Sequence, residues 1–428
     1  MISTIRTVRA VLAIAICAAL LTGCGDTFRP TINFQPQPGG DPSSLGHAVV
    51  LSTNPAGDGS DTHINVSGDT NVGVVNTGPN PVFLGKSGIG RVFVINGDKT
   101  LTLYLALLPN GSPVTTVTLP ASTSGPIGGA TSSNGNTYIA NNGSNDVSVL
   151  PGTQTSITQV VPVGTQPVMV ATNSSGNKAY VINNGSNNVT VIGTQDNSVI
   201  KTIPVGSQPI WGVMSDDGVD VFVVNQGSGT VSVIDTTLDI VFTTIPVGTS
   251  PNFAFYDNVK KRVYVTNTGN NTVSVIKADS INLGVTPQIL PVKLKDVAVS
   301  GSPVSVGAIA DGTRAYVALG GCPAGTNHIN LLTNLASCNG NKVSVIDATG
   351  LVESKVITVG SGAVSISPAV DGTKIYVPNA HDGNISIIKT STDTELMRMQ
   401  APLQNLSCAN PSICPATPQT PFAVLTFP

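Results

Sequence analysis

Six cysteines and four histidines are the residues of this 428-residue chain whose side chains are most suited to covalent chemistry or metal binding. Four of the cysteines form two close pairs in the sequence, Cys322 with Cys338 and Cys408 with Cys414. The first residues of the chain predict export, so these cysteines should be oxidised, and local pairing is expected among the three possible connectivities. A metal site is the alternative, but there is no C-x-x-C spacing and only His328 is close to a cysteine pair.

Three other side chains are candidates for binding a ligand or a partner. His328 lies between Cys322 and Cys338, and His381 is followed directly by Asp382. We expect all three on one candidate binding face, because long loops are where binding sites usually lie. Two histidines without a carboxylate cluster are more typical of solvated loop residues than of metal ligands. With no Ser-His-Asp set, P-loop or HExxH motif, the sequence predicts no catalytic residue, metal or cofactor.

The composition restricts the possible partners. Charged residues make up 10% of the chain and the net charge is −3, so no basic surface is available for nucleic acid. The 45 glycines and 30 prolines predict frequent turns, while 40% hydrophobic residues are enough for a sizeable core. The sequence therefore indicates a folded domain, and we expect it to be a monomer.

An internal repeat determines the expected fold. Aromatic anchors recur every 42 residues at Tyr138, Tyr180, Phe222 and Tyr264. Further copies have their anchors at Phe93, Tyr316 and Tyr376, with a weaker one at Val50, so eight units are counted. Each unit alternates β-branched and small polar residues with turn signals between, which is the pattern of four short strands. Four-stranded units of this length predict the blades of an all-β propeller around a central channel.

The ends of the repeat predict how the ring closes. A proline that opens the innermost strand precedes the next anchor by 13 residues in regular units, as with Pro209 and Phe222. Pro421 opens such a strand with no anchor after it, and the first unit begins at its anchor. We therefore expect residues 422–427 to complete the first blade, because closure removes exposed strand edges.

The recurring asparagines and the single tryptophan are interpreted as structural residues. An asparagine stands three residues after most anchors, as at Asn225, and is expected to start the hairpin and bond its own backbone. Trp211, the only tryptophan, lies on an inner strand, where packing between blades is favoured over lining the channel.

Residues 264–267 read Tyr-Val-Thr-Asn, and this motif resembles the signature of the YVTN (YncE-like) β-propeller family. The resemblance covers nearly all of residues 46–428 and implies the propeller fold. Members usually have seven blades, which is the alternative to the count of eight. Their relatives include lactonase-like propellers and surface-layer proteins, so the motif is specific for fold and weak for function.

The N-terminal sequence predicts that the protein is located in the cell envelope. Residues 1–23 combine two arginines with an apolar run too short for a permanent membrane span, as in a signal peptide. Residues 21–24 read Leu-Thr-Gly-Cys and resemble the lipobox of bacterial lipoproteins, which implies lipidation at Cys24. Residues 24–45 would then be a Pro/Gly-rich tether. Gly25 after the cysteine, by resemblance to enterobacterial sorting, favours the outer membrane.

Two functions are compatible with these features. The first is a non-catalytic envelope binding or scaffold protein, membrane-attached by its N-terminal lipid, whose face loops hold a protein or glycan partner. The alternative is a lactonase-like hydrolase, which should place acids, histidines or arginines on the inner strands. Those strands, such as PIWGVMS from Pro209, are almost without charge. The sequence therefore favours the binding protein.

Overall fold

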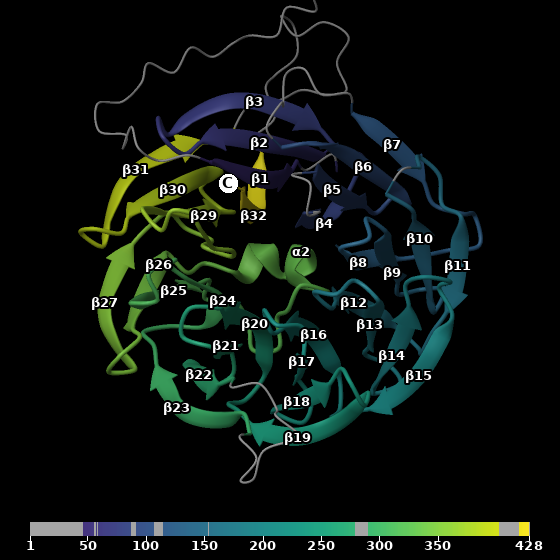
Figure 1. The fold of residues 1–428 in the computed structure, drawn as a ribbon. Helices are drawn as coiled ribbons and strands as arrows, with labels where there is room; N and C mark the ends of the chain where they lie inside the picture. The colour runs from purple at the N-terminus through teal and green to yellow at the C-terminus, as the bar shows by residue number, and fades with distance from the viewer. Residues whose placement is uncertain are drawn as a thin grey trace, which may run out of the picture. The chain divides into compact units, whose positions relative to one another are not determined.

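A computed structural model describes residues 46–54, 57, 59–86, 91–106, 114–152, 154–278, 290–401 and 419–427. These residues form eight antiparallel four-stranded sheets. The sheets are arranged as blades around a central channel, with the chain running once around the ring (Figure 1). The all-β propeller with eight blades is confirmed. The predicted signal peptide, Cys24 and the tether lie outside the described residues.

Blades 1 to 4 each run from an innermost strand outward. Blade 1 is β32 (Thr420–Phe427), β1 (His47–Thr53), β2 (Gly59–Asn65) and β3 (Thr70–Asn76). Blade 2 is β4 (Pro81–Lys86), β5 (Arg91–Asn96), β6 (Thr100–Leu105) and β7 (Thr115–Thr118). Blade 3 is β8 (Pro126–Thr131), β9 (Thr137–Asn141), β10 (Asp146–Leu150) and β11 (Gln159–Pro162). Blade 4 is β12 (Pro167–Thr172), β13 (Lys178–Asn183), β14 (Asn188–Gly193) and β15 (Val199–Pro204).

Blades 5 to 8 follow the same order. Blade 5 is β16 (Pro209–Met214), β17 (Asp220–Asn225), β18 (Thr230–Asp235) and β19 (Ile240–Pro246). Blade 6 is β20 (Pro251–Asp257), β21 (Arg262–Asn267), β22 (Thr272–Lys277) and β23 (Val292–Ala298). Blade 7 is β24 (Pro303–Ala308), β25 (Arg314–Leu319), β26 (Lys342–Asp347) and β27 (Val352–Thr358). Blade 8 is β28 (Ser367–Pro368), β29 (Lys374–Asn379), β30 (Asn384–Lys389) and β31 (Thr394–Gln400).

The ring closes where the two ends of the repeat meet. β32 pairs antiparallel with β1, from His47 opposite Phe427 to Thr53 opposite Thr420. β32 is thus the innermost strand of blade 1, and it also contacts β4 of blade 2 and β28 of blade 8. The predicted closure by N- and C-terminal strands is confirmed.

Anchor tyrosines join one blade to the next. In blade 4, the Tyr180 hydroxyl donates to Oδ1 of Asp239 in blade 5 at 2.8 Å. Lys178, two residues earlier, places Nζ 2.7 Å from Oδ2 of the same carboxylate. Asp239 has a φ of 54°, a left-handed conformation that aspartate tolerates in tight turns. The anchors Tyr316 and Tyr376 make the same hydrogen bond to Asp393 and Asp69, whereas the buried hydroxyl of Tyr264 has no partner among the described residues.

The joint at the closing seam is the most deeply buried of these pairs. Lys374 of blade 8 lies 2.8 Å from Asp69 of blade 1, with side chains 3% and 2% exposed. Tyr376 donates to the other oxygen of Asp69 at 3.2 Å. Loss of either charged partner would leave an uncompensated buried charge, which typically costs about 3–5 kcal/mol. Strand pairing and this ion pair therefore hold the same seam.

The inner strand of blade 8 is shorter than the sequence predicts. The segment AVSISPA from Ala363 was expected to be a strand, but β28 covers only Ser367–Pro368, with an isolated bridge between Ala363 and Asn379. The neighbouring position on β29 is Pro378, which pairs with Ile385 of β30 on its other side. Proline has no N–H to donate toward the inner strand, so the ladder is interrupted there.

The recurring asparagines have a structural role, but the predicted bonding to their own backbone is wrong. Nδ2 of Asn225 donates to the hydroxyls of Ser232 at 2.9 Å and Thr230 at 3.1 Å, both on the next strand. The asparagine also packs against Gly206 in the loop that enters the blade. A Cβ on Gly206 would lie 2.7 Å from Cγ of Asn225, so this close approach requires glycine.

A buried titratable group lies at the joint between blades 1 and 2. Asp61 on β2 is fully buried and accepts a hydrogen bond from the Tyr104 hydroxyl on β6. Burial raises the pKa of Asp61 to about 7, against the smaller opposing effect of the Tyr104 hydrogen bond. His63, two residues along β2, is also buried, and this burial lowers its pKa to about 4.

These shifts predict how Asp61→Asn changes the pH dependence of stability. The unfolded aspartate ionises from pH 3.8 upward, whereas the folded one stays neutral until about pH 7, so its contribution to stability falls across that interval. Asp61→Asn removes this loss. Thermal melting should show little gain at pH 4 and a gain of up to about 4 kcal/mol at pH 8.

The exposed Asp98→Asn is the matched control for replacing a carboxylate by an amide, since it relieves no burial. The His63 contribution, lost as pH falls from 6.5 toward 4, is present in both proteins and cancels in the comparison. An Asp61→Asn protein with the same melting difference at both pH values would contradict the prediction.

Candidate binding pocket in the central channel

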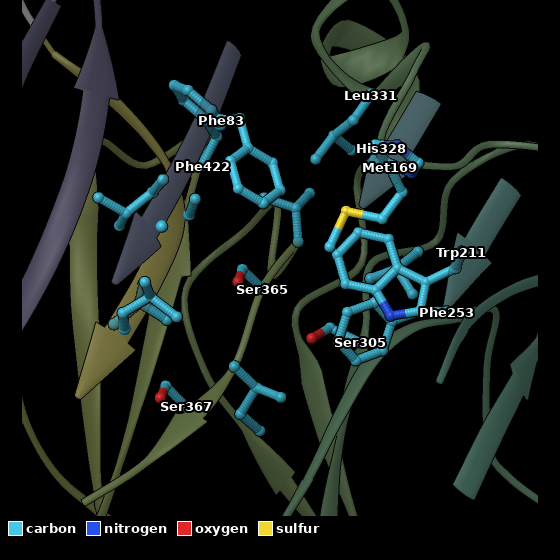
Figure 2. A pocket seen from close by; sticks show the side chains of 18 of the residues that line it. Phe83, Met169, Trp211, Phe253, Ser305, His328, Leu331, Ser365, Ser367 and Phe422 are labelled. Atoms are coloured by element: carbon cyan, nitrogen blue, oxygen red, sulfur yellow. The ribbon is translucent and has the colours of Figure 1, made fainter. Parts of the chain in front are cut away.

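A cavity of about 420 Å³ occupies the central channel. Its walls are mainly inner strands, and four of its large side chains stand two residues after the proline that opens their strand: Phe83, Met169, Trp211 and Phe253. In these strands the pairing register shifts directly after the proline. This bulge re-aims the following side chain, so the same offset in successive blades gathers large apolar groups in one place. Figure 2 shows them facing one another.

The segment between β25 and β26 covers one end of this cavity. It contains α2 (Leu331–Asn334) and a short 3₁₀ turn, Leu335–Ser337, and we call residues 323–337 the cap. A disulfide joins Cys322 to Cys338 across its base, which is the local pairing expected for this insertion. α2 lies over the centre of the ring (Figure 1). Leu331 and Leu332 of the cap line the cavity.

The cap is hydrogen-bonded to several blades other than its own. Nε2 of His328 donates to the carbonyl of Val168 in blade 4 at 3.1 Å. Nδ2 of Asn327 donates to Gln226 after blade 5's second strand at 2.9 Å. On the opposite side, Nε2 of His381 in blade 8 donates to the carbonyl of Leu335 at 2.7 Å. These contacts fix the cap across the channel and not above its own blade.

His328 lies in the pocket, so the expectation of a solvated loop residue is wrong. Its ring is 5.0 Å from the Trp211 ring in an edge-on arrangement. Burial is the main influence on its pKa and lowers it to about 4, so the ring is neutral at pH 7. Because Nε2 carries the hydrogen donated to Val168, Nδ1 keeps a lone pair, and this buried atom has no protein partner.

Trp211 both joins blades and lines the channel, whereas packing between blades alone was favoured from the sequence. Its Nε1 donates to the carbonyl of Ala254 in blade 6 at 3.1 Å. Its ring lies 4.8 Å from that of Phe253. The indole is therefore held in place from one side and presents its other side to the cavity (Figure 2).

Few polar groups line the cavity. Lys86 is the one lysine, arginine, aspartate or glutamate in its described lining. The side chains of Ser305 and Ser365 also face the space (Figure 2). Among described residues, no three His, Cys, Asp or Glu side chains gather to hold a metal ion. The described part of the chain also contains no helix long and apolar enough to span a membrane.

The remaining predicted site residues have different outcomes. His381 and Asp382 share the capped face with His328, but they serve to hold loops: Oδ2 of Asp382 accepts from the backbone N–H of Ser361 at 2.9 Å. Cys408 and Cys414 lie outside the described residues. The sequence interpretation missed Phe83, Met169 and Phe253, although their constant offset from the inner-strand prolines was a usable signal.

Solved structures share the fold of this chain at low sequence identity. The dihydro-heme d1 dehydrogenase NirN, in complex with DHE, matches with a TM-score of 0.67 and 15% identity, over 92% of this chain and 77% of NirN. Apo AztD from Citrobacter koseri matches with a TM-score of 0.59 and 12% identity, over 90% and 98% of the two chains. The chain is a β-propeller.

A third similar structure is the periplasmic gluconolactonase PpgL of Pseudomonas aeruginosa, with a TM-score of 0.55 and 17% identity, over 75% of this chain and 97% of PpgL. Identities this low show the fold of the β-propeller alone. No family model matches the chain. No curated protein matches it either.

The cap geometry predicts the effect of breaking the disulfide. In a Cys322→Ser, Cys338→Ser double variant, the cap segment loses its covalent closure while the blades keep theirs. A disulfide closing a loop of about 15 residues contributes about 3 kcal/mol by restricting the unfolded segment. We expect faster amide exchange in residues 325–337 and a red shift in the emission of Trp211, with unchanged exchange in β17 and β18.

The control is the parent protein under oxidising conditions. Equal exchange rates in the cap of both proteins would show that its hydrogen bonds to blades 4, 5 and 8 hold it without the disulfide, contrary to this prediction.

Proposed function

We propose that this β-propeller is a non-catalytic ligand-binding protein of the cell envelope that holds an apolar small molecule in its central channel. The observation that carries the proposal is the capped cavity between Trp211, Phe253, Phe83 and Met169. Its volume of about 420 Å³ falls within the range typical of small-molecule sites, which are mostly apolar with few polar groups. Aromatic faces on opposite walls favour a ligand with a ring or a flat body.

The position of the cap supports a small ligand over a protein or glycan partner. The insertion predicted to hold such a partner turns Leu331 and Leu332 inward, where they line the cavity. His328, the insertion's histidine, is likewise occupied with Val168 and Trp211. We therefore assign the insertion to ligand retention, and a macromolecular partner on the outer side of the cap is a less supported alternative.

A lactonase-like activity has weaker support. The similarity to the gluconolactonase PpgL is one of fold, and the described cavity lining contains no carboxylate. His328 is the one side chain there with a free basic atom, Nδ1, and the burial that lowers its pKa makes it a weak base. Turnover of a sugar lactone by the purified protein, lost in His328→Gln, would overturn the non-catalytic part of the proposal.

The envelope location and the family membership are also proposals. The Tyr-Val-Thr-Asn motif at residues 264–267 supports the YVTN family, and the lipobox-like residues 21–24 support a lipid anchor, with the outer membrane favoured. Cys24→Ser should abolish incorporation of labelled palmitate and release a folded domain into the soluble fraction, because acyl chains contribute nothing to the blades. Palmitate labelling that persists in Cys24→Ser would contradict the lipid anchor.

The neutral dye N-phenyl-1-naphthylamine tests the channel site. It brightens in apolar surroundings and absorbs where tryptophan emits, and Trp211 is the single tryptophan of the chain. We expect one dye per chain, with energy transfer from Trp211. Ser305→Phe places a ring in the cavity and should weaken binding at least about tenfold, the cost of about 1.4 kcal/mol of lost contact.

Ser305→Ala is the matched control, since it removes the hydroxyl without filling the space, and it should bind the neutral dye within about twofold of the parent. Dye binding that is absent in the parent, or equally strong in Ser305→Phe, would remove the support for a channel ligand.

A further inference from the structure

Lys86, the one charged side chain of the described lining, stands at the end of the cavity opposite the cap. The cap bonds to Val168, next to the proline that opens β12, so the inner strands begin at the capped end. β4 begins there with Pro81 and ends with Lys86 at the other end. Between Phe83, level with the cap in Figure 2, and Lys86 the strand advances three residues, or about 10 Å. In the described part of the chain, the cavity therefore has a neutral capped end and a cationic end opposite the cap.

Lys86 is exposed, and it lines the cavity at the last residue of β4. Nζ lies 5.9 Å from the centre of the Phe427 ring. The salt bridges of the described residues do not include Lys86, whereas they do include six other lysines and arginines: Lys178, Lys261, Lys293, Arg314, Lys374 and Arg398. Desolvation by burial lowers the pKa of Lys86 below its ordinary value. An anion placed beside this ammonium would form a charge-assisted hydrogen bond with it.

We propose that the channel ligand is an amphipathic monoanion, such as a medium-length carboxylic acid, with its apolar body between Trp211 and Phe83 and its anionic group on Lys86. This inference rests on the proposed function and names its ligand class. The one cation of the described lining pairs with one negative charge on the ligand. The distance from the aromatic residues to Lys86 matches a body with one charged end.

The absence of other charges in the described lining argues against different ligand classes. A cationic ligand would meet Lys86 and no carboxylate. A sugar would present many hydroxyls to walls made largely of aromatic and aliphatic side chains, where few partners are available. The neutral His328 at the capped end adds an acceptor at Nδ1 and no charge. An amphipathic monoanion would place its charge beside Lys86 and its apolar body against the aromatic and aliphatic walls.

Two dyes that differ by one charged group separate this inference from the proposed function. Anilinonaphthalene sulfonate carries one negative charge, and N-phenyl-1-naphthylamine has nearly the same ring system without it. Both are titrated into the parent protein with Trp211 energy transfer as the readout. The measured quantity is the ratio of the two affinities, and we expect the parent to prefer the anion, less so at high salt.

Lys86→Met should lower this anion-to-neutral ratio about tenfold, Lys86→Arg should restore most of it, and the exposed Lys342→Met should leave it unchanged. Decanoate should displace the anionic dye better than decanol in the parent but not in Lys86→Met. A ratio that Lys86→Met does not change would overturn the monoanion inference while leaving the channel site intact. Failure of both dyes to bind the parent would instead overturn the proposed function.

Discussion

The pairing of β32 with β1 is the interaction on which the rest of the structure depends. It joins residues 420–427 to residues 47–53 and thereby converts a row of eight blades into a ring. The channel exists only within that ring, since its walls come from inner strands far apart in the sequence. The cap depends on it too, because its partners in blades 4, 5 and 8 are within reach only when the ring is closed. The buried Lys374–Asp69 pair reinforces the same seam.

Much of the fold could be predicted because it is repeated and local. A spacing of 42 residues, alternating β-branched residues and asparagine-rich turns determine strands and blades within each unit. The exceptions come from residues that act across strands: Pro378 interrupts an inner strand that reads normally in the sequence, and Asn225 bonds to the next strand instead of its own turn.

The pocket was harder to predict, since it depends on which side chains of different blades converge in the channel. A bulge after each inner-strand proline decides that Trp211 and Phe253 turn toward the channel, and periodicity alone does not reveal a bulge. His328 illustrates the same limit. A histidine in a polar insertion has the sequence context of a solvated residue, and only the path of the cap across the ring brings it to Trp211.

The channel wall is less constrained by backbone hydrogen bonds at the interrupted inner strand of blade 8 than at the other described inner strands. Residues 364–366 line the cavity but lack the ladder that ties the other inner strands to their blades, and the amide of Val364 reaches Pro378 only at 3.4 Å. Local opening requires little free energy where few backbone hydrogen bonds must break. This part of the channel wall can therefore adjust to the shape of a bound molecule more readily than the inner strands that are fully paired within their blades.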